Sequence, residues 1–328
     1  MIARAPLALS CGEPAGIGPE IALAAWRALR ADLPFVWLGD PRHLPAGTPF
    51  QVIESADQAA GVVADAMPVL AHGFGGARTP GQPDPANAQG VIDVIARGVD
   101  LVQGGQCRAL TTAPIHKKAL ADGAQFVYPG HTEYLAALAS VDRVVMMLAC
   151  DMLRVVPTTI HIPLAEVPRS LTAALLTDTL LITHAALRRD FGVMRPRIAV
   201  AGLNPHAGEG GKMGREEIDL IIPVLDALRA QGMDLTGPMS ADTMFHAAAR
   251  AGYDVAVCMY HDQALIPIKT LDFSGGVNVT LGLPFVRTSP DHGTAFDIAG
   301  KGLADATSLI AALRMADQMA QARHGTDG

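Results

Sequence analysis

The sequence predicts an α/β fold, and three observations carry that prediction. Short apolar runs typical of buried strands alternate along the 328 residues with longer runs of helical apolar spacing. Half of the residues are hydrophobic and only 17% are charged, as in a chain that buries a large core. No fixed-period repeat interrupts the alternation. We therefore expect a sheet of buried strands with helices on both faces.

The individual elements follow from these runs. Short apolar segments predict strands at 6–10, 35–39, 107–114, 143–149, 154–163, 197–202 and 254–260. Apolar residues repeating every three to four positions predict helices at 18–29, 116–123, 170–192, 216–232, 241–252 and 303–324. The segment 75–90 is rich in Pro and Gly and is expected to be a loop or an excursion.

Composition and charge exclude several classes of function. A net charge of −7 argues against a nucleic-acid surface, which needs clustered Lys and Arg. The most apolar stretches are broken by Asp or Arg and are too short to span a membrane. The four cysteines form no C-x-x-C pair, which favours buried thiols in a reducing compartment. We expect a cytoplasmic protein without nucleic-acid or membrane partners.

A glycine-rich stretch, "GLNPHAGEGGKMGREE" at 202–217, lies between a predicted strand and a predicted helix. Its glycines do not follow the G-x-G-x-x-G spacing, and Met213 after Lys212 departs from the ending of a P-loop. The glycines serve either a bound group or close packing, and the stretch alone does not decide between the two.

Three histidines occupy the same position on three predicted strands. His161, His206 and His261 each come at or just after the carboxyl end of one, where open α/β sheets bind ligands. A single histidine there is more often structural, but three in equivalent places favour a metal site. Three imidazoles leave a coordination position for water or substrate, which is typical of a catalytic ion.

Two further groups of residues are suited to an anion and to an extended ligand. His131 and Thr132 come just before a helical run, where free N–H groups favour anions. Lys269, Asn278 and Arg287 add charge and directed hydrogen bonds, although each taken singly is most often a solvated side chain. The small residues of 289–302 permit close approach of a ligand, although a plain tight turn is the simpler explanation of them.

Together these motifs resemble the 4-hydroxythreonine-4-phosphate dehydrogenase family, in order and at full length. The resemblance is carried by "GEPAGIGPE", "TTAPIHK", "PGHTEYLA", "GLNPHAGEGGKMGREE", "GPMSADT", "MYHDQALIPIK" and "GVNVTLGLPFVRTSPDHGTAFDIAGKG". The "DHGTAFDIAGKG" part is also similar to the cofactor loop of isopropylmalate and isocitrate dehydrogenases, which bind a dinucleotide without a Rossmann fingerprint.

The resemblance implies an isopropylmalate-dehydrogenase-like fold of two α/β/α lobes with the active site in the cleft between them. Residues 1–125 plus 268–328 are expected to form lobe one. Residues 126–267 are expected to form lobe two, with the metal-ligand strands and the dimer contacts. The cofactor loop, 289–302, implies NAD(P) contacts at Gly293, Thr294, Ala295 and Asp297.

The implied reaction is the NAD(P)-dependent oxidation of 4-phosphooxy-L-threonine to 2-amino-3-oxo-4-(phosphooxy)butanoate, in pyridoxine 5'-phosphate biosynthesis. That product loses carbon dioxide to give 3-amino-2-oxopropyl phosphate. The family's metal ligands fall on the three histidines, with zinc, magnesium or cobalt as the ion. Its substrate contacts fall on His131, Thr132, Lys269, Asn278 and Arg287.

The resemblance also implies a homodimer with shared sites, in which His161 and His206 come from one subunit and His261 from the other. Asp242 and Asp262 are candidate proton acceptors or supports for the metal ligands, and a capping role fits each equally well. His116 and Lys117 are candidates to line the cleft, although ordinary surface placement is the simpler interpretation.

Two other functions remain open on the sequence. The nearest is a dehydrogenase of threonate or erythronate 4-phosphate, because the phosphate contacts do not report the group at C2; an aromatic dihydrodiol is disfavoured by the same contacts. A metal-dependent binding protein without turnover would need a vestigial cofactor loop. The physiological ion and the choice between NAD and NADP are also open.

Overall fold

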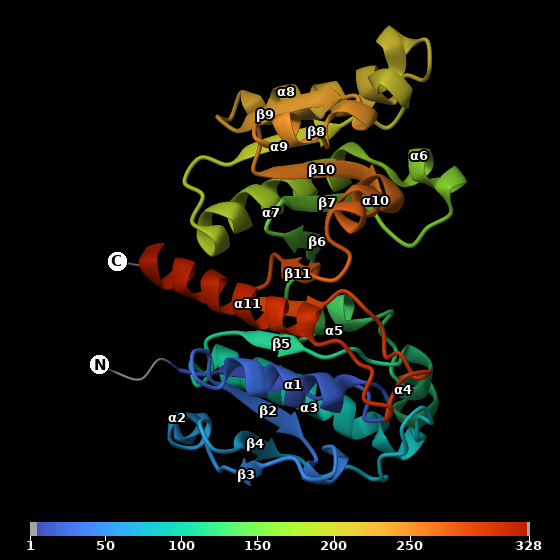
Figure 1. Ribbon diagram of the computed structural model, residues 1–328. Helices are drawn as coiled ribbons and strands as arrows, with labels where there is room; N and C mark the ends of the chain where they lie inside the picture. Colours follow the sequence, from blue (N-terminus) through green and yellow to red (C-terminus); the bar gives the residue numbers. More distant parts are fainter. Residues whose placement is uncertain (1–4, 327–328) are drawn as a thin grey trace. The chain divides into compact units, whose positions relative to one another are not determined.

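The computed structural model describes residues 5–326, with side chains through residue 323. The chain forms two compact units, each built from discontinuous segments: Met1–Val144 with Leu283–Gln321, and Val145–Gly282 with Ala322–Gly328 (Figure 1). The expected lobe boundaries, 125/126 and 267/268, lie before these divisions on the chain. The outermost ends of the expected first lobe, residues 1–4 and 327–328, lie outside the described residues. The functional role of each lobe stays a prediction.

The sheet of the first unit is parallel, with its strands in the order β3-β4-β2-β1-β5-β12. These strands are β1 (Leu7–Ser10), β2 (Phe35–Gly39), β3 (Phe50–Val52), β4 (Met67–Ala71), β5 (Leu110–Thr112) and β12 (Arg287–Pro290). Every residue of β1 and β2 is buried, as expected for parallel strands covered on both faces.

Helices of the first unit are α1 (Gly18–Leu29), α2 (Ala59–Val62), α3 (Ala88–Gln103), α4 (Lys117–Ala124), α5 (His131–Leu138) and α11 (Thr307–Thr326). In α1, Pro19 lies in the first turn, where its missing N–H removes no helical bond. The buried residues of α1 include Ile21, Ala25 and Leu29, spaced by one helical turn. The buried Trp26 donates from Nε1 to the Val63 carbonyl at 2.9 Å.

The sheet of the second unit is mixed, in the order β11-β6-β7-β10-β8-β9. The strands are β6 (Val145–Cys150), β7 (Leu153–Thr159), β8 (Arg197–Ala201), β9 (Asp234–Met239), β10 (Val255–Tyr260) and β11 (Val277–Leu281). β6 pairs antiparallel with both β11 and β7. The neighbours β7, β10, β8 and β9 are parallel, so their carboxyl ends lie at one edge of the sheet.

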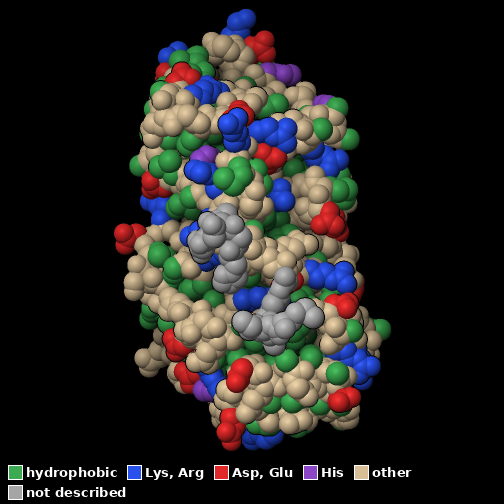
Figure 2. Space-filling view, turned by 90° about the vertical axis from the view of Figure 1, so that its left-hand side faces the viewer, with side chains coloured by type: hydrophobic (Ala, Val, Ile, Leu, Met, Phe, Trp, Pro, Cys, Tyr) green, Lys and Arg blue, Asp and Glu red, His purple; other side chains and the backbone are tan. Residues whose placement is uncertain are grey.

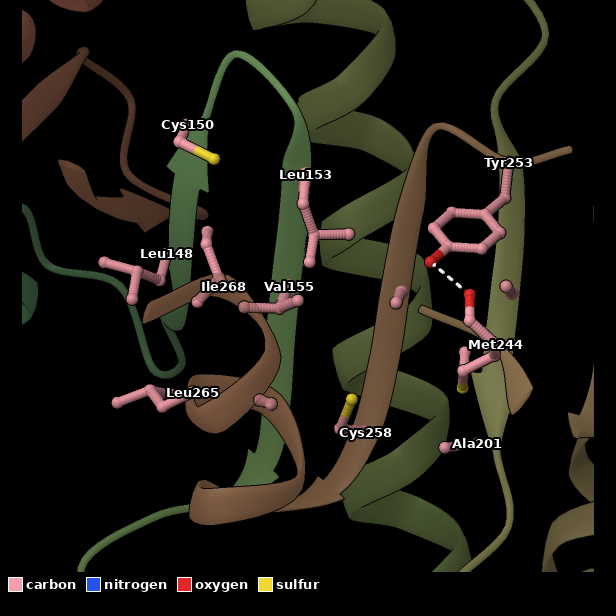
Figure 3. Packing of buried hydrophobic residues seen from close by; sticks show 13 residues of the cluster. Leu148, Cys150, Leu153, Val155, Ala201, Met244, Tyr253, Cys258, Leu265 and Ile268 are labelled. Atoms are coloured by element: carbon pink, nitrogen blue, oxygen red, sulfur yellow. Dashed lines mark hydrogen bonds between the residues drawn. The ribbon is translucent and has the colours of Figure 1, made fainter. Parts of the chain in front are cut away.

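Helices of the second unit are α6 (Val167–Ser170), α7 (Ala173–Phe191), α8 (Ile222–Arg229), α9 (Ala247–Arg250) and α10 (His261–Leu271). Figure 3 shows α10 on one face of the sheet and α7 on the other. Leu265 and Ile268 of α10 pack with Leu148 and Val155 of the strands in one buried cluster (Figure 3). Tyr253 is buried with them, and its hydroxyl donates to the Met244 carbonyl at 2.8 Å.

The predicted α/β class is confirmed, with differences in individual elements. The sequence runs did not single out β3, β4, β9, β11, β12, α2, α3, α6 or α10. The predicted helix at 241–252 is reduced to α9, because His246 caps a new start by accepting from the Ala249 N–H. All four cysteines are free and buried, as expected.

Surface and helix properties agree with the bulk composition. On the face that Figure 2 shows, acidic and basic side chains are interspersed. Over residues 5–326, no helix taken singly has the length and apolarity to cross a membrane. One pair bent by 89°, Leu164–Ser170 with Ala173–Phe191, meets those criteria only when its parts are combined.

Candidate functional site

The three predicted histidines follow three adjacent parallel strands. His161 comes two residues after β7, His261 directly after β10, and His206 five residues after β8. Because β10 pairs with both β7 and β8, the three segments leave the sheet at the same edge. The prediction that each histidine lies at a strand's carboxyl end is confirmed.

His161 and His261 lie side by side in one chain. Their ring centroids are 5.7 Å apart, and both line a pocket of about 260 Å³ that also includes Asp262. Asp262 Oδ1 lies 2.7 Å from His261 Nδ1. A carboxylate accepts, so Nδ1 carries the proton and Nε2 is left as the ligand nitrogen. His161 has a φ of 53°, a strained conformation that is concentrated at functional sites.

His206 lies on an unusual turn after β8. Residues 206–210 all have left-handed backbone angles, with φ between 46° and 79°. Three of these five residues are not glycine, and each non-glycine residue in this region costs about 1–2 kcal/mol. His206 is exposed. The turn therefore presents an accessible imidazole on a backbone that the surrounding structure has to hold.

Gln263 connects this turn to the start of α10. Its Oε1 accepts from the Met259 N–H and its Nε2 donates to the Gly202 carbonyl, each at 2.7 Å. One side chain thus ties the residue that opens the His206 stretch to the end of β10, which carries His261.

A metal ion fits part of this arrangement. The imidazoles of His161, which is exposed, and His261, which is partly exposed, lie beside a pocket and are donors that zinc and similar ions prefer. Within residues 5–326 of one chain, however, no group of three or more His, Cys, Asp or Glu side chains comes close enough to hold an ion. The chain brings two of the three candidate ligands, His161 and His261, next to each other.

The two candidate acids line a second pocket of the same unit, of about 450 Å³. Asp262 is 69% exposed and bonds to His261 as described. Asp242 accepts from the Ser240 hydroxyl at 2.5 Å, in a turn that contacts the His206 turn. The structure brings both acids to the histidine edge, and their catalytic roles stay predictions.

Part of the expected phosphate set gathers in the first unit. His131 and Thr132 open α5 after Gly130, at a helix N-terminus suited to an anion. Arg287 is 2% exposed and donates to Thr112 Oγ1 at 2.6 Å. Burial, then the charges of Arg287 and Lys117, holds the pKa of His131 well below its ordinary value. His131 Nε2 is buried and has no hydrogen-bond partner among the described residues.

The rest of that set belongs to the second unit. Lys269 lies on α10, two turns beyond His261, with its Nζ 5.6 Å from the Phe273 ring. Asn278 lies on β11, between the buried residues Val277 and Val279. Roles for both in substrate binding stay predictions.

The expected cofactor loop follows β12. Gly293, Thr294, Ala295 and Asp297 lie in it, and Ala295 has a φ of 46°. The Thr294 carbonyl accepts from the Ile17 N–H at 3.0 Å, so the loop lies against the residues before α1. A Cβ on Gly16 would come within 2.8 Å of that carbonyl. This contact explains one glycine of the "GEPAGIGPE" motif.

Glu20 fastens the far end of this loop. Its Oε1 accepts from the Gly300 N–H and from Arg78 Nη2, both at 2.6 Å. Arg78 also donates from Nε to the Pro14 carbonyl at 2.9 Å. One carboxylate therefore joins α1, the cofactor loop and the segment expected as an excursion at 75–90.

Sequence reasoning did not single out the supporting residues of these sites. Lys117, considered a surface residue, is exposed and still acts electrostatically on His131. Other supporting residues make contacts that form only in the folded chain and that no local sequence pattern predicts: Gln263, Glu20 and Glu217. Their presence inside the recognised motifs was the one available signal.

Comparisons with known proteins show which family this chain belongs to. A family model described as "Pyridoxal phosphate biosynthetic protein PdxA" matches residues 32–316. A 4-hydroxythreonine-4-phosphate dehydrogenase from Roseobacter denitrificans is 68% identical over 323 residues, 98% of this chain and 99% of that protein. The crystal structure of the enzyme of that name from Klebsiella pneumoniae superposes with a TM-score of 0.88 at 38% identity, covering 96% of this chain and 99% of that one.

A terephthalate 1,2-cis-dihydrodiol dehydrogenase from Burkholderia xenovorans is more distant, with a TM-score of 0.67 and 29% identity over 95% of this chain and 97% of that one. The fold and the named relatives define an α/β dehydrogenase, a class that implies a nicotinamide cofactor. The chain belongs to the PdxA family of pyridoxal phosphate biosynthetic proteins. It is an oxidoreductase of that pathway, as the motifs predicted.

Proposed function

We propose that this enzyme oxidises the C3 hydroxyl of 4-phosphooxy-L-threonine with NAD(P) and that the product decarboxylates to 3-amino-2-oxopropyl phosphate. The observation that carries the proposal is a cluster of positive charge in the first unit. The charges of Arg287 and Lys117 reach His131, at the start of α5, and help to lower its pKa. A phosphate monoester, which is an anion at neutral pH, fits such a group. The names of the relatives support the amino acid substrate over a four-carbon acid-sugar phosphate.

His131, Thr132 and Arg287 hold the phosphate together with Lys269 and Asn278. His131 is neutral near pH 7 because its pKa is lowered, so one ring N–H remains for the phosphate while Arg287 supplies the charge. A phosphate oxygen would also satisfy His131 Nε2, which is buried without a partner. Binding energy at this remote group holds C3 in place for hydride transfer.

His161, His206 and His261 are proposed to bind one divalent ion, zinc, magnesium or cobalt. When bound, such an ion supplies Lewis acidity to the oxygen at the reacting carbon. Asp262 keeps the proton of His261 on Nδ1 and so keeps Nε2 available. Asp242 is proposed to accept a proton at the same edge. Gly293, Thr294, Ala295 and Asp297 are proposed to contact the dinucleotide.

The active enzyme is proposed to be a homodimer that shares its metal sites. In one chain His161 lies beside His261, with ring centroids 5.7 Å apart. This adjacency favours a division that differs from the expected one: His161 and His261 from one subunit and His206 from the other. His161 and His206 are exposed and the His261 side chain is 39% exposed, which fits such an arrangement, since a partner's ligand has to reach them.

The test is turnover followed by the absorbance of NADH or NADPH. The metal-free enzyme is supplied with zinc, cobalt or magnesium and either 4-phosphooxy-L-threonine or threonate 4-phosphate. We expect turnover of the amino acid, abolished by a chelator and restored by the ion. Preferential turnover of threonate 4-phosphate would replace the proposed substrate, and full activity without metal would remove the ion from the reaction.

A further inference from the structure

The turn that carries His206 is strained along its whole length. His206, Ala207 and Glu209 are non-glycine residues with φ of 52°, 50° and 46°, and Gly208 and Gly210 lie in the same left-handed region. A peptide of this composition would not adopt five such residues in a row unaided. Contacts outside the turn therefore have to hold it.

Glu217 supplies these contacts. Its side chain is only 2% exposed. Oε1 accepts from the Asn204 N–H at 2.8 Å, and Oε2 accepts from Asn204 Nδ2 at 3.0 Å. A Cβ on Gly208 would lie 2.6 Å from Oε2, so the turn packs directly on the carboxylate. The two oxygens of the buried Glu217 carboxylate thus hold Asn204, just before the turn. Gly208, in the middle of the turn, packs against Oε2.

The start of the following helix places this carboxylate. Residues Glu217–Ile221 form a π-helical turn before α8, a feature that is rare and concentrated at functional sites. Two glycines line the carboxylate: a Cβ on Gly202 would lie 3.1 Å from Oε1, as one on Gly208 would crowd Oε2. Hydrogen bonds to an ionised carboxylate are roughly twice as strong as neutral ones, which suits a residue that restrains strained backbone.

We propose that Glu217 is a positioning residue for His206: its carboxylate holds the left-handed turn in the conformation that presents the imidazole to the metal ion. The inference rests on the proposed function in that His206 is taken as a metal ligand. Glu217 touches neither substrate nor ion in this account, and it acts through Asn204 and Gly208.

The test compares Glu217→Gln with Glu209→Gln in the metal-free protein. Both variants remove one negative charge near His206, but the Glu209 side chain is exposed and makes no hydrogen bond within residues 5–326. An amide at position 217 has one acceptor oxygen where the carboxylate has two, so its NH2 group faces one of the two Asn204 donors. We expect Glu217→Gln to speed hydrogen exchange at amides 204–214 and to weaken Co²⁺ binding, measured calorimetrically, by about ten- to a hundredfold. Glu209→Gln should change neither beyond about twofold.

A second pair tests the packing contact without altering charge. Gly208→Ala places a Cβ against Glu217 Oε2, whereas a Cβ on Gly210 meets nothing within 4 Å, although both have positive φ. We expect Gly208→Ala to weaken Co²⁺ binding more than Gly210→Ala. Equal effects, or wild-type exchange and affinity in a cooperatively folded Glu217→Gln, would overturn the positioning role. If the wild type binds no Co²⁺, the metal proposal fails, and hydrogen exchange alone then decides whether Glu217 holds the turn.

Discussion

At the residue scale, Arg287 combines deep burial with a cationic charge. Its guanidinium donates to Thr112, and burial lowers its pKa to about 10, so it stays protonated at neutral pH. Under the proposed function, this cation attracts the substrate phosphate.

We expect Arg287→Lys to weaken the use of the phosphorylated substrate. Lysine keeps the charge and loses the planar fork, so contacts of about 1.5–3 kcal/mol are impaired and kcat/KM should fall by about ten- to a hundredfold. The affinity for NAD should stay close to wild type. Steady-state kinetics with a substrate analogue lacking the phosphate is the control. An equal loss with that analogue would show a different role for Arg287.

His131 should make the folded protein less stable in acid. Its folded pKa lies well below the ordinary 6.5, because burial and the charges of Arg287 and Lys117 oppose protonation. Below about pH 6.5 the unfolded chain therefore binds a proton that the folded chain does not, and stability falls as the pH falls toward the folded pKa.

His131 is expected to contribute at most about 1.4 kcal/mol per pH unit to the slope of the unfolding free energy against pH. Urea unfolding of wild type and His131→Gln between pH 7 and pH 5 measures it. The variant should lose less stability over this range. Identical slopes would mean that His131 titrates alike in both states. His43 and His184, whose pKa values are also lowered, leave part of the slope in the variant.

At the element scale, a carboxylate of α1, that of Glu20, holds one end of the expected cofactor loop. Glu20→Ala removes the acceptor of both the Gly300 N–H and Arg78. We expect KM for NAD to rise severalfold with a smaller change in kcat, because the loop loses an anchor distant from the reacting atoms. Asp32→Ala, at an exposed acid beyond the end of α1, is the matched control. A rise in the substrate KM alone would point away from the cofactor loop.

The elements that the sequence predicted are those whose burial is visible in apolar residues. Strands β1, β2, β7 and β10 read as apolar runs because both of their faces are covered. β12, with the sequence RTSP, is fully buried, yet its polar side chains hide that burial. β3 is exposed along its length and has no apolar run to find. Such strands are determined by pairing with neighbours, which local composition does not report.

The candidate site divides in the same way. The three histidines could be found because chain order alone places them after strands. The bond from Asp262 to His261 and the Glu217 contacts depend on backbone angles, such as the φ of 52° at His206, that only the folded chain defines. The residue types predicted the chemistry of the site, whereas the orientation of the histidines and the residues that hold them could be found only in the structure.

At the scale of the whole molecule, the division of the histidines between subunits can be measured by mixing inactive variants. Chains carrying His161→Ala, His206→Ala or His261→Ala are unfolded and refolded in pairs. With random mixing half of the dimers are mixed, and one of their two sites is intact whenever the mutated residues come from different subunits. Activity should then return to about a quarter of wild type.

The pair that fails to complement identifies the two histidines that one subunit supplies. The adjacency of His161 and His261 in one chain predicts that this pair stays inactive, while both mixtures containing His206→Ala recover. Recovery of the His161 and His261 pair with an inactive His161 and His206 pair would restore the division expected from the resemblance. Failure of all three pairs, with subunit exchange demonstrated, would exclude a shared site.

The discontinuous first unit has a consequence for how the protein is made. β5 is synthesised about 175 residues before its partner β12, since Leu110 pairs with Arg287. All strands of the second unit, through β11 at Leu281, leave the ribosome before β12 begins at Arg287. Because domains fold as units during synthesis, the later-made unit can complete its sheet while the earlier-made one waits for a strand. The N-terminal half of the chain thus finishes folding last, so a nascent chain stopped at residue 282 should resist protease in its second unit while the edge of β5 stays open.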